Sequence, residues 1–308
     1  MKIALLCATQ RGLRVLHKLA AIMPPHTELL VITFKEEQWE PPFFEEIRAA
    51  AEKLGATFIE TKQVGAPQLS ALWESVDLML VVSWRFLIPA SVYERIRLGA
   101  FVFHDSLLPA YRGFSPTVWA MINGETQTGV TLFRIAQQVD AGEILAQYSV
   151  TIEADETISI VMERVTLTYL RLLEENLPKL ISGQVVYYPQ DVTQATYTCK
   201  RLPEDNRIDW QCPSREIFNL IRAVTRPYTG AYTTLHGEKL IIWQAAMIAD
   251  FPRYVGRVTG RVIEVKKGVG SVILTGDGGL LVQEVQLGQN PLKGADEVLN
   301  SLSLTLGR

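Results

Sequence analysis

Residues 99–119 read Gly-Ala-Phe-Val-Phe-His-Asp-Ser-Leu-Leu-Pro-Ala-Tyr-Arg-Gly-Phe-Ser-Pro-Thr-Val-Trp. The apolar β-formers at 101–103 predict a short buried strand that ends at His104. Turn-forming residues follow, Pro109 fixes the backbone φ, and a helix is expected over 116–122. Ligands of open α/β sheets bind beyond the carboxyl ends of the strands. We therefore expect His104 at the mouth of such a crevice.

A carboxylate follows a second strand-like run in the same way. Asp140 comes after the apolar run 129–135 and before Gly142. An Asp beside a His orients the ring and favours its protonated form, which is the pairing a general base needs. A lone His beside a strand is more often structural, but of the chain's four histidines only His104 precedes a polar loop rich in Gly and Pro. The pattern predicts that His104 and Asp140 act together in acid/base chemistry.

The region 99–147 resembles the signature region of the 10-formyltetrahydrofolate-dependent formyltransferases. The matching motifs are His104, Ser106-Leu-Leu-Pro109, Tyr111-Arg-Gly113, Gly124-Glu125, Gly129-Val-Thr131 and Asp140-Ala-Gly142. The resemblance continues through residues 203–205, 208–210, 222–224 and 226–231. Within the family, the chain is most similar to nucleotide-sugar N-formyltransferases such as the UDP-4-amino-4-deoxy-L-arabinose formyltransferase domain, rather than to methionyl-tRNA formyltransferase.

The resemblance implies that His104 is the general acid/base and that Asp140 tunes it. The family's third catalytic residue is an asparagine two positions before the histidine, and this chain has Val102 there. Losing one oxyanion donor costs about 2–4 kcal/mol of barrier. Three interpretations stay open: another donor or a water serves the oxyanion, the enzyme is slow, or the chain binds its ligands without efficient chemistry. Polar groups close in sequence to the motifs are candidate donors: Asp105, Ser106, Ser83 and Asn123.

The resemblance also implies binding residues. Backbone groups of two segments would bind the pterin ring of 10-formyltetrahydrofolate: Phe86, Leu87 and Ile88, and Ala136, Gln137, Gln138, Val139 and Asp140. A loop backbone can supply the paired donors and acceptors that a pterin edge needs. Expected contacts to the acceptor substrate are Ser106, Tyr111, Arg112, Gly113 and Trp84. Core packing for Trp84, and hydrogen bonds from Arg112 to loop carbonyls, are the structural alternatives.

Composition limits the function classes. A net charge of −3 and a pI near 5.9 argue against a protein built chiefly to hold a polyanion, so nucleic acid is an unlikely partner. Three scattered cysteines are too few for a disulfide framework or a zinc site, and we expect no metal. No apolar run approaches the roughly 18 residues that a membrane helix needs. We expect a cytoplasmic protein that binds no membrane.

The chain length of 308 residues and the alternation of strand and helix patterns predict two domains. Residues 1–199 are expected to form an α/β domain with a Rossmann-like parallel sheet. Residues 200–308 are expected to form a smaller OB-like β-barrel, which the resemblance also implies. The expected strands are 2–7, 28–33, 57–59, 78–82, 144–152, 231–235, 239–243, 256–265, 270–275 and 280–285. The expected helices are 12–22, 43–54, 89–96, 157–182 and 214–225. Ser214 is expected to cap the last of these, and the apolar positions of 157–182, Ile160 and Leu167 among them, are expected to face the core. Gly278-Gly279, between two strand runs, is a hairpin signal.

The function that these observations favour is formyl transfer from 10-formyltetrahydrofolate to the primary amine of a nucleotide-linked amino deoxysugar. Such a product belongs to lipopolysaccharide or other surface-glycan synthesis. Methionyl-tRNA formylation is the first alternative, although the acidic loop 36–42 would repel an acceptor stem. A folate- and nucleotide-binding homologue that is catalytically impaired through Val102 is the second. A homodimer stays open.

Overall fold

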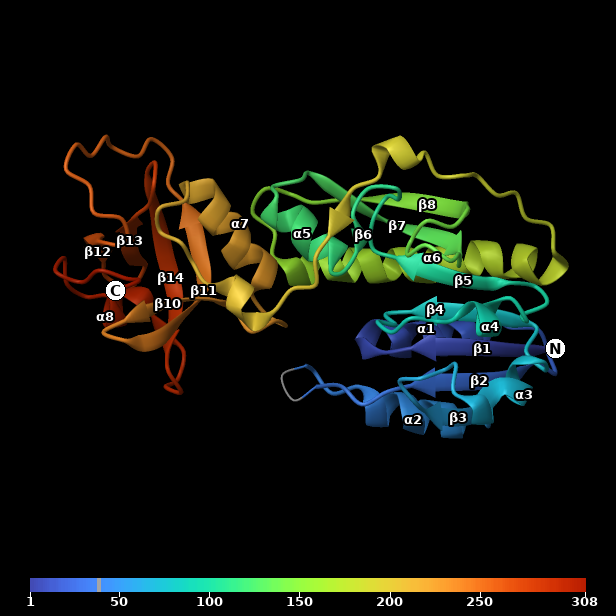
Figure 1. The fold of residues 1–308 in the computed structure, drawn as a ribbon. Helices are drawn as coiled ribbons and strands as arrows, with labels where there is room; N and C mark the ends of the chain where they lie inside the picture. The colour runs from blue at the N-terminus through green and yellow to red at the C-terminus, as the bar shows by residue number, and fades with distance from the viewer. Residues whose placement is uncertain (38–39) are drawn as a thin grey trace. The chain divides into compact units, whose positions relative to one another are not determined.

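The computed structural model describes residues 1–37 and 40–308 (Figure 1). These residues form two compact units. The first contains Met1–Pro116, Gln127–Thr151 and Glu163–Cys199, and the second contains Thr117–Thr126, Ile152–Met162 and Lys200–Arg308. The division into domains 1–199 and 200–308 stays a prediction.

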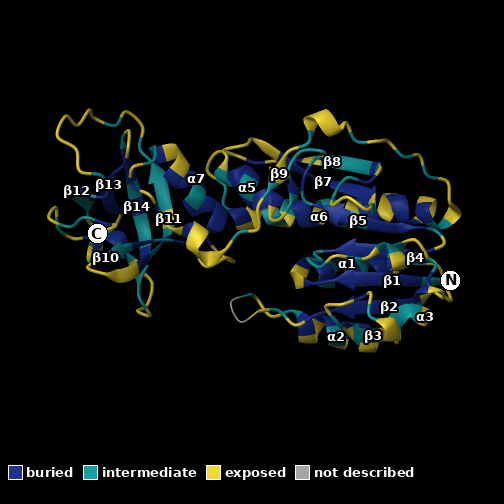
Figure 2. Ribbon diagram, in the orientation of Figure 1, coloured by how far each residue is buried: buried dark blue, intermediate teal, exposed yellow. Residues whose placement is uncertain are grey.

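The first unit is built on a seven-stranded sheet with the order β3-β2-β1-β4-β5-β7-β8. Its strands are β1 (Lys2–Cys7), β2 (Glu28–Thr33), β3 (Thr57–Glu60), β4 (Leu78–Val82), β5 (Ala100–His104), β7 (Gln127–Arg134) and β8 (Ile144–Thr151). The first five run parallel, as the alternating pattern predicts, and β7 and β8 run antiparallel at one edge. The parallel strands read as nearly continuous apolar runs because both of their faces are covered (Figure 2).

Helices cover the two faces of this sheet. They are α1 (Thr9–Ile22), α2 (Phe44–Lys53), α3 (Ser70–Trp73), α4 (Ala90–Tyr93) and α6 (Ile158–Ser182). On one face, α6 lies beside α1, with ion pairs Arg14–Glu163 and Lys18–Glu174 between the two helices. On the other face, α3 and α4 contribute to a hydrophobic cluster with alternate residues of β1, β2, β4 and β5. Side chains of β5 therefore alternate between two packed layers.

Short elements complete the described chain. They are η1 (Pro67–Leu69), α5 (Pro116–Ile122), η2 (Val192–Gln194), η3 (Pro203–Asn206) and the two-residue strands β6 (Arg112–Gly113) and β9 (Tyr197–Thr198). Strands β6 and β9 pair in parallel.

The second unit carries an antiparallel sheet with the order β10-β11-β14-β13-β12, and β15 pairs with β14. Its elements are β10 (Ala231–Leu235), β11 (Glu238–Met247), β12 (Val262–Lys266), β13 (Gly270–Leu274), β14 (Gly279–Leu287), β15 (Lys293–Gly294), α7 (Ser214–Val224) and α8 (Ala295–Val298). The all-antiparallel, hairpin-rich pairing is the architecture expected of the OB-like domain. Gly278 and Gly279 lie at the β13–β14 connection, as their hairpin signal predicts.

Four local predictions need correction. Helix α4 ends at Tyr93 instead of 96, and β12 begins at Val262, after an exposed loop from 252 to 258. Ser214 is the first residue of α7 and not its cap, because the Asp277 carboxylate accepts the Ser214 backbone N–H at 2.8 Å. On α6, Ile160 and Leu167 are about half exposed, because the buried stripe runs through other positions such as Val161, Val165 and Tyr169.

Candidate functional site

His104 is the last residue of β5 and is 8% exposed. Strand β5 lies between β4 and β7, with Phe103 beside Val82 and His104 beside Thr131. Two ladders thus fix the backbone at His104, at the carboxyl edge of the parallel strands. Because side chains alternate along a strand, Val102 and His104 share a face, whereas the Phe103 ring stacks on Tyr169 of α6.

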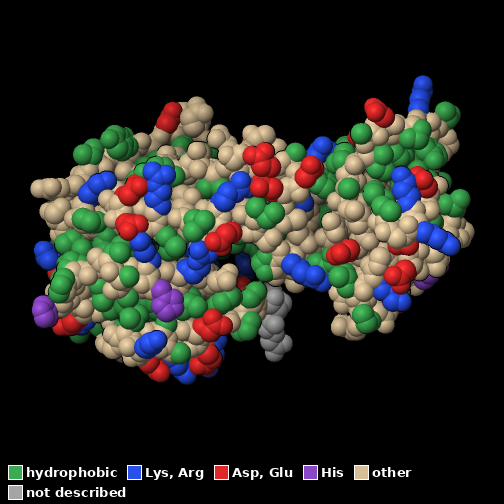
Figure 3. Space-filling model, turned by 180° about the vertical axis from the view of Figure 1, so that it is seen from behind, with side chains coloured by type: hydrophobic (Ala, Val, Ile, Leu, Met, Phe, Trp, Pro, Cys, Tyr) green, Lys and Arg blue, Asp and Glu red, His purple; other side chains and the backbone are tan. Residues whose placement is uncertain are grey.

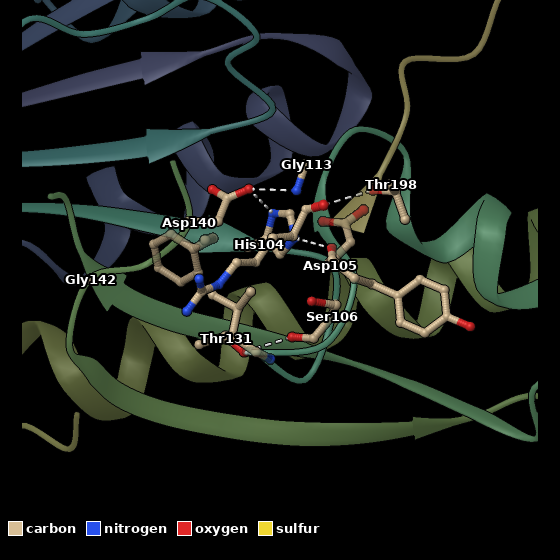
Figure 4. A network of polar contacts seen from close by, with 12 residues as sticks. His104, Asp105, Ser106, Gly113, Thr131, Asp140, Gly142 and Thr198 are labelled. Atoms are coloured by element: carbon tan, nitrogen blue, oxygen red, sulfur yellow. Dashed lines mark hydrogen bonds and ion pairs between the residues drawn. The ribbon is translucent and has the colours of Figure 1, made fainter. Parts of the chain in front are cut away.

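The His104 ring points toward Asp140 (Figure 4). Nδ1 of His104 lies 3.8 Å from Oδ2 of Asp140, and Nε2 lies 2.9 Å from the carbonyl oxygen of Tyr111. A carbonyl oxygen can only accept a hydrogen bond. Nε2 therefore carries a proton and donates a hydrogen bond to the carbonyl of Tyr111. In the neutral ring, Nδ1 is therefore the basic nitrogen, and it faces the carboxylate. A proton bound at Nδ1 therefore faces the Asp140 carboxylate.

Asp140 is held in a backbone conformation that is uncommon for a residue other than glycine. Its φ is +53°, and its Oδ2 accepts the backbone N–H of Gly113 at 2.8 Å. Such strain persists only where the surroundings fix it, and it concentrates at functional sites. Two residues on, a Cβ at position 142 would collide with the carbonyl oxygen of Arg134, so the close approach there requires Gly142. The Asp140-Ala-Gly142 motif therefore has a direct structural reason.

An ionic network anchors the residue after His104 on the opposite face of the sheet. Nη1 of Arg11 donates to both carboxylate oxygens of Asp105, at 2.8 and 2.6 Å, and the Tyr169 hydroxyl also bonds that carboxylate. Arg11 is 6% exposed, so this charge is paired away from water. Burial, and then the Asp105 charge, raise the pKa of Tyr169 well above its usual value, so the hydroxyl stays a donor. Asp105 thus ties the His104 loop to α1 and α6.

Two of the expected substrate contacts, Ser106 and Arg112, have side chains that are buried and hydrogen-bonded within the protein, and their contact with a substrate stays a prediction. Ser106 is 2% exposed, and its hydroxyl donates to the carbonyl of Ala110 at 2.7 Å. Arg112 is 1% exposed, and its Nη2 and Nε donate to Oε1 of Gln190 at 2.6 and 3.2 Å. Arg112 therefore donates its hydrogen bonds to a glutamine side chain, whereas the structural alternative predicted hydrogen bonds to loop carbonyls. The hydrogen bonds of Ser106 and Arg112 therefore hold the His104 loop in its shape.

A cavity of about 450 Å³ opens beside the Asp140 loop. Its lining includes Ala136, Gln137, Ala141 and Gly142, together with Ala100 at the start of β5. The volume falls within the range of small-molecule sites. Of the expected pterin-binding residues, Ala136 and Gln137 line this cavity directly. Their contact with the pterin stays a prediction.

The other expected binding residues lie outside the lining of that cavity. Phe86 makes edge-to-face contacts with Phe34 and Trp84, and Leu87 is 81% exposed. Trp84 and Ile88 pack against the hydrophobic cluster beneath α3 and α4. These residues, with Gln138, half-exposed Val139, Tyr111 and Gly113, stay predictions as ligand contacts.

Val102 packs, partly buried, against the same hydrophobic cluster and can donate no hydrogen bond. Of the candidate replacements, Asp105 is an ion-paired acceptor, and the Ser106 hydroxyl is already used. Asn123 belongs to the second compact unit. Ser83 directly follows β4, next to the position where β5 carries His104, and has a φ of +53°. Ser83 is therefore the strongest of the candidate oxyanion donors.

Two residues of this site, Gln190 and Tyr169, could not be predicted from any local sequence signal. Gln190 and Tyr169 contact the motif loops from positions 48 to 78 residues away in the chain. A buried arginine such as Arg112 needs a hydrogen-bond acceptor, and only that need could have suggested a partner such as Gln190. Among residues 1–37 and 40–308, no group of three or more His, Cys, Asp or Glu side chains is placed to hold a metal ion. In the same ranges, no helix combines the length and apolar character needed to span a bilayer.

Family models match both parts of the chain. The formyl transferase model matches residues 36–175, and the model of the formyl transferase C-terminal domain matches residues 201–303. The chain therefore belongs to the formyl transferase family. His104 and Asp140 both lie in the part that the first model matches.

Solved structures share the fold at low sequence identity. An N-formyltransferase from Helicobacter canadensis, in complex with folinic acid and dTDP-3-aminofucose, superposes with a TM-score of 0.69 at 18% identity, covering 92% of this chain and 99% of that one. The sugar 3-N-formyltransferase WlaRD, with dTDP and 5-N-formyl-tetrahydrofolate, gives 0.68 at 18% identity, covering 94% and 99%. The methionyl-tRNA formyltransferase from Clostridium thermocellum gives 0.58 at 18% identity, covering 80% and 94%.

Proposed function

We propose that this formyltransferase moves the formyl group of 10-formyltetrahydrofolate to the primary amine of a nucleotide-linked amino deoxysugar. The observation that carries the proposal is the pairing of His104 Nδ1 with the Asp140 carboxylate at the carboxyl edge of the sheet. Family membership supports the reaction class. The ligands of the two sugar-enzyme structures support the choice of donor and acceptor.

The chemistry needs one proton to be moved. The amine nitrogen bonds to the formyl carbon to give a tetrahedral intermediate, and the bond from that carbon to N10 of the folate breaks when the intermediate collapses. His104 accepts the amine proton at Nδ1 as the tetrahedral intermediate forms and returns a proton to N10 as it leaves. Asp140, held by the Gly113 N–H, orients the ring and stabilises its cationic form. Neither side chain forms a covalent bond to the formyl group.

The charge distribution is consistent with a small acceptor. The chain carries 30 basic and 33 acidic residues. Figure 3 shows both signs interspersed on the face it presents, without a continuous basic stripe. A tRNA substrate would call for a clustered surplus of Lys and Arg. We also propose a cytoplasmic location, no nucleic-acid partner and a role in surface-glycan synthesis, and we leave a homodimer open.

The decisive experiment incubates the protein and 10-formyltetrahydrofolate with a panel of UDP- and dTDP-linked amino sugars, and with methionyl-charged tRNA in parallel. We expect an N-formyl product from an amino sugar. His104→Ala and Asp140→Asn should each lower kcat at least about a hundredfold while folinic acid still binds, because the pair acts on the barrier. Product from tRNA alone would move the assignment to tRNA formylation. Near-normal turnover by His104→Ala would remove the proposed mechanism.

A further inference from the structure

Asp140 and His104 lie on backbone segments that are held in place in different ways. His104 ends a strand that is paired on both sides: its own partner is Thr131 of β7, and the preceding residue Phe103 also pairs with Val82 of β4. Asp140 lies in the connection between β7 and β8, in a strained conformation with a φ of +53°. The Gly113 N–H of the His104 loop donates to the Asp140 carboxylate at 2.8 Å, so the position of the carboxylate depends on how the two loops are held together.

Gln190 bridges the two loops. Its Nε2 donates to the carbonyl oxygens of Asp140 and Gly142, at 2.9 and 2.7 Å. Its Oε1 accepts from the guanidinium of Arg112, which precedes Gly113 in the His104 loop. Every hydrogen-bonding direction of this side chain is therefore used on one loop or the other.

The segment after Gln190 holds the His104 loop as well. The backbone N–H groups of Tyr111 and Arg112 donate to Thr196, at its hydroxyl and its carbonyl, with distances of 2.8 and 2.9 Å. The Thr198 hydroxyl donates to the carbonyl of Arg112 at 3.0 Å (Figure 4). The segment 190–198 thus fastens one side of the His104 loop, and Gln190 alone extends the attachment to the Asp140 loop.

We propose that Gln190 is a positioning residue of the formyl transfer reaction, acting with Arg112 as a clamp that keeps the Asp140 carboxylate in register with Nδ1 of His104. The proposal rests on the proposed function of that pair. A shift of about 1 Å between catalytic groups can cost about a hundredfold in rate. Gln190 bonds to Arg112 and to the backbone carbonyls of the Asp140 loop, so its loss should lower kcat by displacing Asp140.

The variants separate positioning from folding. Gln190→Glu keeps the acceptor for Arg112 and gains a charge opposite the guanidinium, but it removes the two bonds to the Asp140 loop. Gln190→Met would leave the buried guanidinium without that acceptor and could unfold the protein. The Arg112→Met/Gln190→Met double variant avoids this, because both polar partners are removed together. Gln194→Met is the matched control, since Gln194 is an exposed glutamine in the same segment.

The first measurement is kinetic. We expect Gln190→Glu to melt within a few degrees of wild type, to lower kcat about 10- to 100-fold, and to change folinic acid affinity by a smaller factor. The double variant should show the same loss of kcat, and Gln194→Met should match wild type. Wild-type kcat in Gln190→Glu would overturn the proposal. A loss explained entirely by a smaller folded fraction would overturn it too.

The second measurement needs no acceptor and so stands apart from the proposed function. Ring ¹⁵N shifts of His104, assigned with His104→Gln, report directly on the carboxylate beside Nδ1. Gln190→Glu should displace them in the same direction as Asp140→Asn, whereas Gln194→Met should leave them in place. If wild type formylates no acceptor but the shifts move as expected, the proposed function fails and the clamp stands. Unmoved shifts in Gln190→Glu refute the clamp whatever the substrate.

Discussion

Replacing Val102 by asparagine tests how the oxyanion is stabilised. The side chain at 102 shares a face with His104 and packs, partly buried, against the hydrophobic cluster under α3 and α4. Exchanging it for an amide removes apolar burial and places a polar group at the cluster's edge, at a cost of on the order of 1–2 kcal/mol in stability. We therefore expect Val102→Asn to fold with a melting temperature a few degrees lower.

The effect on turnover depends on whether a donor is already present. If Ser83 or a water serves the oxyanion, Val102→Asn should leave kcat nearly unchanged or lower it by crowding that donor. If no donor is present, the new amide should raise kcat by about tenfold or more, up to the 2–4 kcal/mol of an oxyanion contact. The structure favours the first outcome, because the Ser83 position adjoins His104 across the β4–β5 ladder.

The assay is the initial rate of tetrahydrofolate release with saturating acceptor, for wild type, Val102→Asn, Ser83→Ala and the double variant. We expect Ser83→Ala to lower kcat about 10- to 100-fold and the double variant to recover part of that loss. A gain of tenfold or more in Val102→Asn alone would refute the view that the oxyanion is already served.

Three further outcomes test other parts of the structure. Asp77 accepts the Lys2 backbone N–H at 2.8 Å, and this bond holds the pKa of its carboxyl below the usual value. That stabilisation is complete above the unfolded-state pKa and is lost as pH falls through the lower folded-state pKa, so Asp77→Asn should be less stable than wild type at pH 7, with the difference shrinking below about pH 4 in urea denaturation. Tyr169→Phe removes a buried donor from Asp105 and should cost about 1–3 kcal/mol in chemical denaturation; no loss would mean that the other partners of Asp105, Arg11 among them, satisfy the carboxylate. Product formation from an amino sugar should change less than about twofold between 50 and 200 mM salt, whereas a substrate bound through 6–10 phosphates would lose about 10³-fold or more in affinity.

The parts of the fold that follow from local pattern could be predicted from the sequence. Strand β5 ends at His104 and α5 spans Pro116–Ile122, both as expected, because a β-branched and aromatic run and a Pro at the first helical position are local signals. Apolar spacing alone predicts Ile160 and Leu167 to be core residues, but in the structure both side chains are about half exposed. The spacing of apolar residues predicts where a helix lies, but it does not determine which of neighbouring apolar residues on that helix are buried.

The contacts that hold the site together could not be predicted in the same way. The pairs Arg112–Gln190 and Arg11–Asp105 join residues 78 and 94 positions apart. Nothing in the neighbourhood of either arginine in the sequence indicates its acceptor, and both look equally suited to bind a substrate. The structure adds what the sequence lacks: the guanidinium of Arg112 is 1% exposed and bonded to the Gln190 side chain.

The residues of the motif therefore fall into two groups with different proposed roles. In the proposed mechanism His104 and Asp140 move the proton, whereas the hydrogen bonds of Ser106 and Arg112 and the missing side chain of Gly142 give the loops the shape that brings the carboxylate to the ring. Because a strained connection supplies the carboxylate, the geometry of the pair depends on hydrogen bonds made outside both strands. Substitutions that leave the reacting groups intact can then slow the reaction as strongly as changes to the groups themselves. Resemblance to a family motif identifies such residues together, and only their exposure and bonding partners tell which of them a substrate could touch.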